Sequence, residues 1–474
     1  MTRDLAPLLE KCFLFEATED SYRVENIQGQ IPAWLRGSYY VNGPARFERA
    51  GMRYKHWLDG DGMICSLRFG AEGVHFTNRF VKTRKVTEED AAGKFLYRGF
   101  GTAFPGDQTL RNVMLEPPVN VSVYPYAGKL LAFGEQSMPM ELDPVTLETR
   151  GEYDFSGSIN EISPFAAHAK TDPANGHLLN FGISFSATAP MLNVYEFDAA
   201  GDLIRRRRHP LQYQHSLHDF GVTPNYCTFY LSPLLMDFNR FVNGGVSVME
   251  SLDWQPEKGS RILVAQRAAK TETPFTVEVE PCYCLHVINC HEEGRLLYVD
   301  VFEMDRPIYG EYQPIPDLFS TAPACRPVRY VIDLDARALR DRIAMAYDKS
   351  PDFPAVDAAR AGSEVNDFWA LGIGEFSGDG RKFFDELVRG SWQAGGICDL
   401  YRVPRAEYLG GEPVCAFNPA NPGEAVVMVQ HFIPAESRVE YLLFDGFHLA
   451  AGPIARLPLK HMIHAGFHAC FHFE

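Results

Sequence analysis

The sequence predicts an all-β protein made of many short strands. Short runs rich in β-branched and aromatic residues recur along the chain, and turn dipeptides such as Asn175-Gly176 and Asp445-Gly446 separate them. The 39 glycines and 32 prolines are spread throughout instead of being gathered in a linker. No regular alternation of strands with helices appears, so a doubly wound parallel sheet is not expected.

The expected strands continue to the end of the chain with no evident boundary, which indicates one domain over residues 1–474. In chain order they cover 119–126, 129–135, 177–186, 226–233, 261–267, 275–280, 295–304, 327–334, 424–433 and 439–446. Few segments look helical, and we expect a helix over 336–348. A β-propeller is the natural architecture, because radial repetition leaves few exposed strand edges. A pair of β-sandwiches competes with it on the pattern alone.

Composition excludes several classes of protein. A chain with 46% hydrophobic and 13% aromatic residues is not disordered. A net charge of −16 disfavours nucleic acid as a partner, since phosphate contacts need a basic surface. No apolar run is long enough for a membrane span, and no secretory signal is visible. The chain has ten cysteines, too few for a disulfide scaffold of this length, so we expect free thiols in a cytoplasmic protein. This expectation includes the closely spaced Cys282, Cys284 and Cys290.

Four of the fifteen histidines are flanked by apolar, strand-like sequence: His168, His218, His286 and His468. They are separated by 50, 68 and 182 residues, so no local metal-binding motif links them. They share a metal only if the fold brings distant strands together, as the inner strands of a propeller would. Spacing alone leaves open that they are ordinary core or surface histidines.

Several sequence blocks resemble the carotenoid cleavage oxygenase family. The blocks are GSYYVNGPARFERAG (37–51), HWLDGDGMICSLRF (56–69), LLAFGEQSMPMELDPVTLET (130–149), H-D-F at His218, H-V-I-N at His286 and G-F-H at His468. They occur in family order over nearly the whole chain. The resemblance implies a seven-bladed β-propeller capped by a dome of loops and short helices. It also implies one Fe(II) on the propeller axis, held by His168, His218, His286 and His468, with O2 as co-substrate.

The resemblance also implies residues around the ligands. Glu135 and Glu412 match two of the three acidic residues that anchor the ligand imidazoles, and Asp352 stands where the family has a Glu. Because Asp is one methylene shorter, we expect its carboxylate to reach the ligand only through a water or a backbone shift. Val121 matches a family position near the metal. His464 replaces a family Pro, and we expect it to be structural or at the surface, not a ligand.

By resemblance, the activity is O2-dependent cleavage of a carbon–carbon double bond into two carbonyl compounds, with no catalytic residue beyond the metal site. The expected partner is an apolar polyene, a carotenoid or apocarotenoid, because Gly134 replaces the Lys with which stilbene-cleaving members grip a phenol. A stilbenoid substrate, non-oxidative isomerisation and a ligand-binding propeller remain alternatives. We expect weak, reversible membrane contact through 104–118.

Overall fold

The structure is a computed structural model that describes residues 6–109, 115–186, 188–268, 273–312, 319, 321–374 and 383–474. Within these residues, seven antiparallel sheets of four or five strands form a seven-bladed β-propeller. The propeller expectation is confirmed, and the alternative of two β-sandwiches is wrong.

The blades follow one another in chain order, and each runs outward from an inner strand. The first three are β34 (Ala469–Phe473), β3 (Gly37–Ala45), β6 (Asp61–Gly70), β7 (Gly73–Phe80) and β1 (Ser21–Arg23); β8 (Ser122–Tyr126), β9 (Lys129–Phe133), β10 (Met140–Leu142) and β11 (Thr149–Glu152); and β12 (Lys170–Thr171), β13 (Leu178–Ser184), β14 (Met191–Phe197) and β15 (Leu203–Pro210). The fourth and fifth are β16 (Gly221–Val222), β17 (Tyr226–Leu231), β20 (Ser260–Gln266) and β21 (Phe275–Val279); and β22 (Tyr283–Glu293), β23 (Leu296–Met304), β24 (Cys325–Asp333) and β25 (Ala338–Ala344). The last two are β26 (Asp352–Ala355), β27 (Asp367–Gly372), β28 (Glu386–Ser391) and β29 (Gly396–Arg402); and β30 (Tyr408–Asn418), β31 (Asn421–Ile433), β32 (Arg438–Asp445), β33 (Ala455–Pro458) and β2 (Gln28–Gly29).

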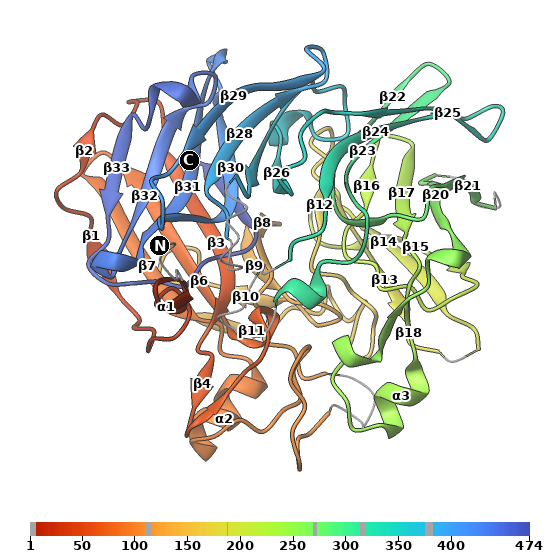
Figure 1. The fold of residues 1–474 in the computed structure, drawn as a ribbon, viewed down its shortest axis with the longest axis horizontal. Coiled ribbons are helices and arrows are strands. Elements are labelled where there is room, and N and C mark those ends of the chain that lie inside the picture. Colours follow the sequence, from red (N-terminus) through yellow and green to blue (C-terminus); the bar gives the residue numbers. More distant parts are fainter. Residues whose placement is uncertain are drawn as a thin grey trace.

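The remaining elements lie outside the seven sheets, mostly in loops that connect strands of one blade, and α2 and α3 both lie at the lower edge of Figure 1. They are the helices α1 (Ala6–Glu10), α2 (Arg84–Ala92) and α3 (Phe238–Asn243); the hairpins β4 (Glu48–Arg49) with β5 (Met52–Arg53) and β18 (Leu234–Met236) with β19 (Leu252–Trp254); and the 3-10 turns η1 (Trp57–Asp59), η2 (Met249–Ser251), η3 (Pro256–Lys258), η4 (Tyr309–Tyr312), η5 (Ala358–Arg360), η6 (Pro434–Glu436) and η7 (Leu449–Ala451).

Strands from the two ends of the chain close the propeller. The C-terminal β34 pairs with β3, with Val41 opposite Ala469, and the N-terminal β2 pairs with β33, with Gln28 opposite Arg456. Figure 1 accordingly shows the red N-terminal strands beside the blue C-terminal ones. This closure fixes β34, and the histidine directly before it, on the inner ring.

The inner strand β22 is buried because it packs against β16 and β26, the inner strands of the two neighbouring blades. β22 is buried from Tyr283 to His291, which explains its nearly continuous apolar sequence. Cys284 and Cys290 lie buried inside this strand and Cys282 lies just before it, and all three are free thiols, as the sequence predicts.

The helix expected over 336–348 is wrong. Residues Ala338–Ala344 form β25, the outermost strand of its blade. This strand pairs with β24, and Ala344 lies opposite Val328 of β24. Leu339 and Ile343 are exposed by 37% and 46%, so their helix-like spacing reflects no buried face. Pairing with the edge of β24 decides the conformation here, because edge hydrogen bonding overrides a weak local preference.

The membrane-related expectations are tested only in part. Among the described residues, no helix is both long and apolar enough to cross a bilayer. Within the segment 104–118 that we associate with membrane contact, residues 110–114 lie outside the described residues.

Candidate metal centre

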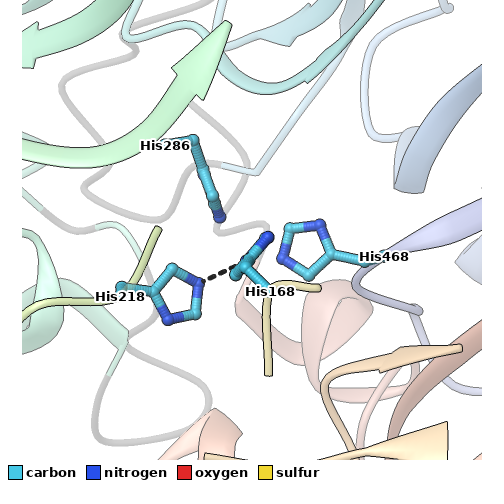
Figure 2. Close-up of side chains that lie close together, drawn as sticks. All are labelled: His168, His218, His286 and His468. Atoms are coloured by element: carbon cyan, nitrogen blue, oxygen red, sulfur yellow. Dashed lines mark hydrogen bonds between the residues drawn. The ribbon is translucent and has the colours of Figure 1, made fainter. Parts of the chain in front are cut away.

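Four histidines from four blades meet at the inner ring. His168, His218 and His468 each lie a few residues before an inner strand, β12, β16 and β34 respectively, and His286 lies within β22. One nitrogen of each imidazole lies within 4.8 Å of the corresponding nitrogen of every other. Figure 2 shows the four rings turned toward one another. The structure therefore brings together the four histidines that the sequence singles out.

The cluster passes two tests as a metal site. Nε2 of His168 lies 2.9 Å from Nε2 of His218, and two imidazole nitrogens each bound at about 2.1 Å and at right angles would lie about 3.0 Å apart. Nε2 of His286 is buried and has no hydrogen-bond partner, which is costly unless something binds it. Four neutral imidazoles suit a borderline divalent metal such as Fe(II), so the donor set fits the group that the resemblance implies.

Two carboxylates lie beside the outer nitrogens of clustered rings, one in close contact and the other beyond hydrogen-bond geometry. Oε1 of Glu135 lies 2.6 Å from Nδ1 of His218, and Oε1 of Glu412 lies 3.5 Å from Nδ1 of His468. Glu412 also accepts a hydrogen bond of 3.0 Å from the backbone N–H of Ala469. A carboxylate on the outer nitrogen leaves the inner nitrogen free to bind a metal.

Asp352 contacts the ring of His286 directly, so of the two expected routes, a water or a backbone shift, the water is not needed. Its Oδ1 lies 2.5 Å from Nδ1 of His286 and accepts a second hydrogen bond of 2.9 Å from the N–H of Phe353. Phe353 has a φ of +56°, and the pairing register of β26 with β27 shifts between Asp352 and Ala355. The local backbone is thus irregular at the point where the shorter side chain meets the ring.

Asp219 is a site residue that the sequence reasoning missed. Its Oδ1 lies 3.6 Å from Nδ1 of His168, the ligand for which no anchoring carboxylate was expected, and 2.8 Å from Nζ of Lys170. The available signal was the H-D-F block, which places an acid directly after His218.

Burial and neighbouring charges set the protonation of the rings. Burial, together with the other imidazoles and Lys170, holds the pKa of His168 well below its ordinary value. Burial also lowers the pKa of His468, although Glu412 opposes the shift. For His286 burial acts in the same direction, but Asp352 outweighs it and the pKa is raised. His168 and His468 are therefore neutral, as metal ligands must be.

A cavity of about 1250 Å³, counting its open part, reaches the cluster. Val121, Glu135 and His218 form its inner end. Val121 is buried, and its carbonyl accepts a hydrogen bond of 3.1 Å from the N–H of His468, so its backbone lies beside the cluster. Apolar side chains line much of the remainder: Leu58, Phe100, Ile183, Phe185, Met236, Phe241, Val248 and Leu252.

His464 is a structural residue of the core. Its Nε2 lies 3.0 Å from the carbonyl oxygen of Phe13, and its ring stacks on Phe15 with the centroids 4.0 Å apart. Burial lowers its pKa to about 3. The structural expectation for His464 is confirmed.

The chain matches the family model described as retinal pigment epithelial membrane protein (RPE65) over residues 14–472. The chain belongs to this family, which is that of the carotenoid cleavage oxygenases.

Curated relatives of the chain are named oxygenases that act on different substrates. It is 27% identical to isoeugenol monooxygenase of Pseudomonas nitroreducens, covering 94% of this chain and 93% of the relative. It is 26% identical to apocarotenoid-15,15'-oxygenase of Synechocystis, covering 94% and 92%, and 26% identical to lignostilbene-alpha,beta-dioxygenase isozyme III of Sphingomonas paucimobilis, covering 93% and 92%. A solved structure of the Synechocystis apocarotenoid oxygenase superposes with a TM-score of 0.90 at 24% identity over the whole of both chains, which shows the fold.

Proposed function

We propose that this protein is a non-haem Fe(II) dioxygenase that cleaves a carbon–carbon double bond of an apolar substrate into two carbonyl products. The observation that carries the proposal is the convergence of four imidazoles, three of them buried and one of these with an unpartnered nitrogen, at the inner end of a largely apolar cavity. Its membership of an oxygenase family supports the same reaction.

In this proposal His168, His218, His286 and His468 hold one Fe(II), and the metal when bound supplies O2 binding and activation at its open positions. Glu135, Asp352 and Glu412 hold the outer nitrogens of three ligands, which fixes the orientation of these rings.

The protein's other task is to position one double bond at the inner end of the cavity. Phe100, Ile183 and Phe185 supply apolar walls of the cavity, and Val121 lines it where His218 and Glu135 do. Such walls exclude water and select one orientation of a long, stiff substrate.

We propose a carotenoid or apocarotenoid as substrate. Gly134 supports this choice. A Cβ at this position would lie 2.9 Å from Cα of Val119 and 3.1 Å from its N, so this backbone leaves little room for a phenol-gripping Lys. Stilbenoids and related phenolic alkenes are the second candidate, because curated relatives act on isoeugenol and lignostilbene.

The deciding experiment is mass spectrometry of products formed by Fe(II)-loaded protein under 18O2. The panel holds carotenoids, apocarotenals, hydroxystilbenes and isoeugenol. Two labelled carbonyl fragments from a polyene support the proposal, and fragments from a phenolic alkene alone select the second candidate. Unlabelled, rearranged product indicates the isomerase alternative. Binding without turnover of any panel member indicates a ligand-binding propeller.

We further propose that residues 1–474 act as one oxygenase domain in the cytoplasm, with transient contact to membranes that store polyenes. Sharing of two blades by strands from both chain ends supports the single domain, and free, mostly buried cysteines support a reducing compartment. Flotation with neutral liposomes tests the membrane contact. Absence of flotation, together with activity unaffected by lipid, would contradict it.

A further inference from the structure

We propose that a recess between the third and fourth blades binds a small oxyanion, of the class of sulfate or inorganic phosphate, through Arg207, His209 and Arg267. The recess shares no residue with the metal cluster or with the cavity that reaches it. Part of its lining comes from four consecutive arginines, residues 205–208, in a chain whose net charge is −16.

The arginine run lies on β15, the outermost strand of the third blade, and its side chains alternate between the two faces of the sheet. Arg206 and Arg208 are exposed, whereas Arg207 is partly buried and His209 is buried. Arg207 lies opposite Val194 on β14, and directly paired residues share a face. Val194 belongs to the apolar cluster that joins the third blade to the fourth, so Arg207 and His209 are on the face turned toward the fourth blade.

The recess has a volume of about 300 Å³, counting its open part. Arg205, Arg207, His209, Glu196 and Arg267 line it together with apolar side chains of both blades. Arg267 follows β20 directly and so comes from the fourth blade, while the other four lie on β14 and β15 of the third. A recess of this size admits a small ion but not a folded partner.

Three nitrogens in the lining are buried without a hydrogen-bond partner: Nε of Arg207, Nε2 of His209 and Nε of Arg267. His209 and Arg267 are only 9% and 7% exposed. Burial and the neighbouring Arg207 lower the pKa of His209, so its ring is neutral and offers a hydrogen bond instead of a charge. Buried donors without acceptors are costly, and an oxyanion offers oxygens to several donors at once.

The charges around the recess leave a positive excess. Glu196 accepts hydrogen bonds of 2.7 Å from Arg205 and 2.9 Å from Arg267, and Asp172 lies 2.8 Å from Arg267. These two carboxylates are therefore occupied by two arginines. Arg207 forms no ion pair within the described part of the chain, so its charge is the one available to an anion.

A bound oxyanion would join the two blades. Arg207 and His209 approach it from the third blade and Arg267 from the fourth. Because only the folded protein brings these donors together, binding stabilises the folded state, and thermal unfolding reports on the site independently of activity.

The test uses sulfate as the probe and the full-length protein. Calorimetric titration and thermal unfolding are carried out at constant ionic strength, with chloride replacing sulfate in the reference. We expect the wild type to bind one sulfate per chain and to unfold at a higher temperature in sulfate than in chloride. Arg207→Met should weaken sulfate binding about tenfold or more, as loss of a charged hydrogen-bond donor does.

Arg208→Met is the matched control, because it removes the same charge from the next residue on the opposite, exposed face of β15, and it should match the wild type. Arg207→Lys should keep more affinity than Arg207→Met. His209→Phe, which removes the nitrogens and keeps a ring, should also weaken binding and decides the matter if Arg207→Met fails to fold. No effect of sulfate beyond that of chloride on the wild type, or equal losses in Arg207→Met and Arg208→Met, would overturn the proposal.

Discussion

The carboxylate of Asp352 and the imidazole of His286 are in direct contact, with 2.5 Å between Oδ1 and Nδ1. The neighbouring N–H of Phe353 holds the same oxygen from the other side. The pair is buried, so the shorter acid is part of a closely packed arrangement and not a loosened version of the family's Glu.

Asp352→Glu should therefore reduce metal affinity instead of improving it. The extra methylene must displace the ring of His286 or the backbone at Phe353, at a cost of about 1–3 kcal/mol in unfolding free energy. Chelator competition and urea unfolding of the metal-free protein measure the two effects. Unchanged stability with equal or tighter metal binding would show that the site accommodates the longer acid.

His286→Ala should abolish metal binding, because it removes a ligand whose Nε2 has no other partner. His464→Ala should keep one metal per chain while losing about 1–3 kcal/mol of stability, since it removes a buried ring and its contact with Phe13. Elemental analysis and thermal unfolding of both variants check this. Metal loss of the same size in the two folded variants would contradict the ligand assignment.

His464 should make the metal-free protein less stable in acid. Its pKa is about 3 in the folded state and near 6.5 when unfolded, so below pH 6.5 only the unfolded chain takes up the proton. The contribution to stability is therefore constant above pH 6.5 and falls by about 2 kcal/mol between there and pH 5.

His464→Gln keeps a donor for the Phe13 carbonyl but does not titrate, so its unfolding free energy should fall less steeply over that range. His448→Gln, at a largely exposed position, is the control. Urea unfolding at a series of pH values measures the slopes, and identical slopes for His464→Gln and wild type would refute the assignment.

Gly134→Lys should destabilise the protein instead of creating a phenol clamp. Its Cβ would lie 2.9 Å from Cα of Val119, so backbone must move, at about 1–3 kcal/mol. Gly396→Lys is the control, because nothing lies within 4 Å of a Cβ there. Urea unfolding and turnover of hydroxystilbenes measure the outcome. A stable Gly134→Lys protein with new stilbene cleavage would contradict this interpretation of the position.

The local sequence was sufficient to select most residues of the candidate metal centre. His168, His218, His286 and His468, with Glu135 and Glu412, stand in recognisable blocks, and the structure brings all six together. Prediction from local sequence was wrong where hydrogen bonding to a neighbouring strand decides the secondary structure. The segment 336–348 carries helix-like spacing, yet Ala338–Ala344 are a strand because the edge of β24 offers them hydrogen bonds.

The sequence by itself determined that the chain is all-β, which family it belongs to and which histidines matter, because strand pattern and motif blocks are local properties of the chain. Only the tertiary structure decided which groups touch: Asp352 reaching His286 directly, Asp219 and Lys170 standing behind His168, and His464 turning to Phe13. These contacts join residues on different blades or at opposite ends of the chain, and their distances depend on backbone irregularities and blade packing that no local pattern encodes.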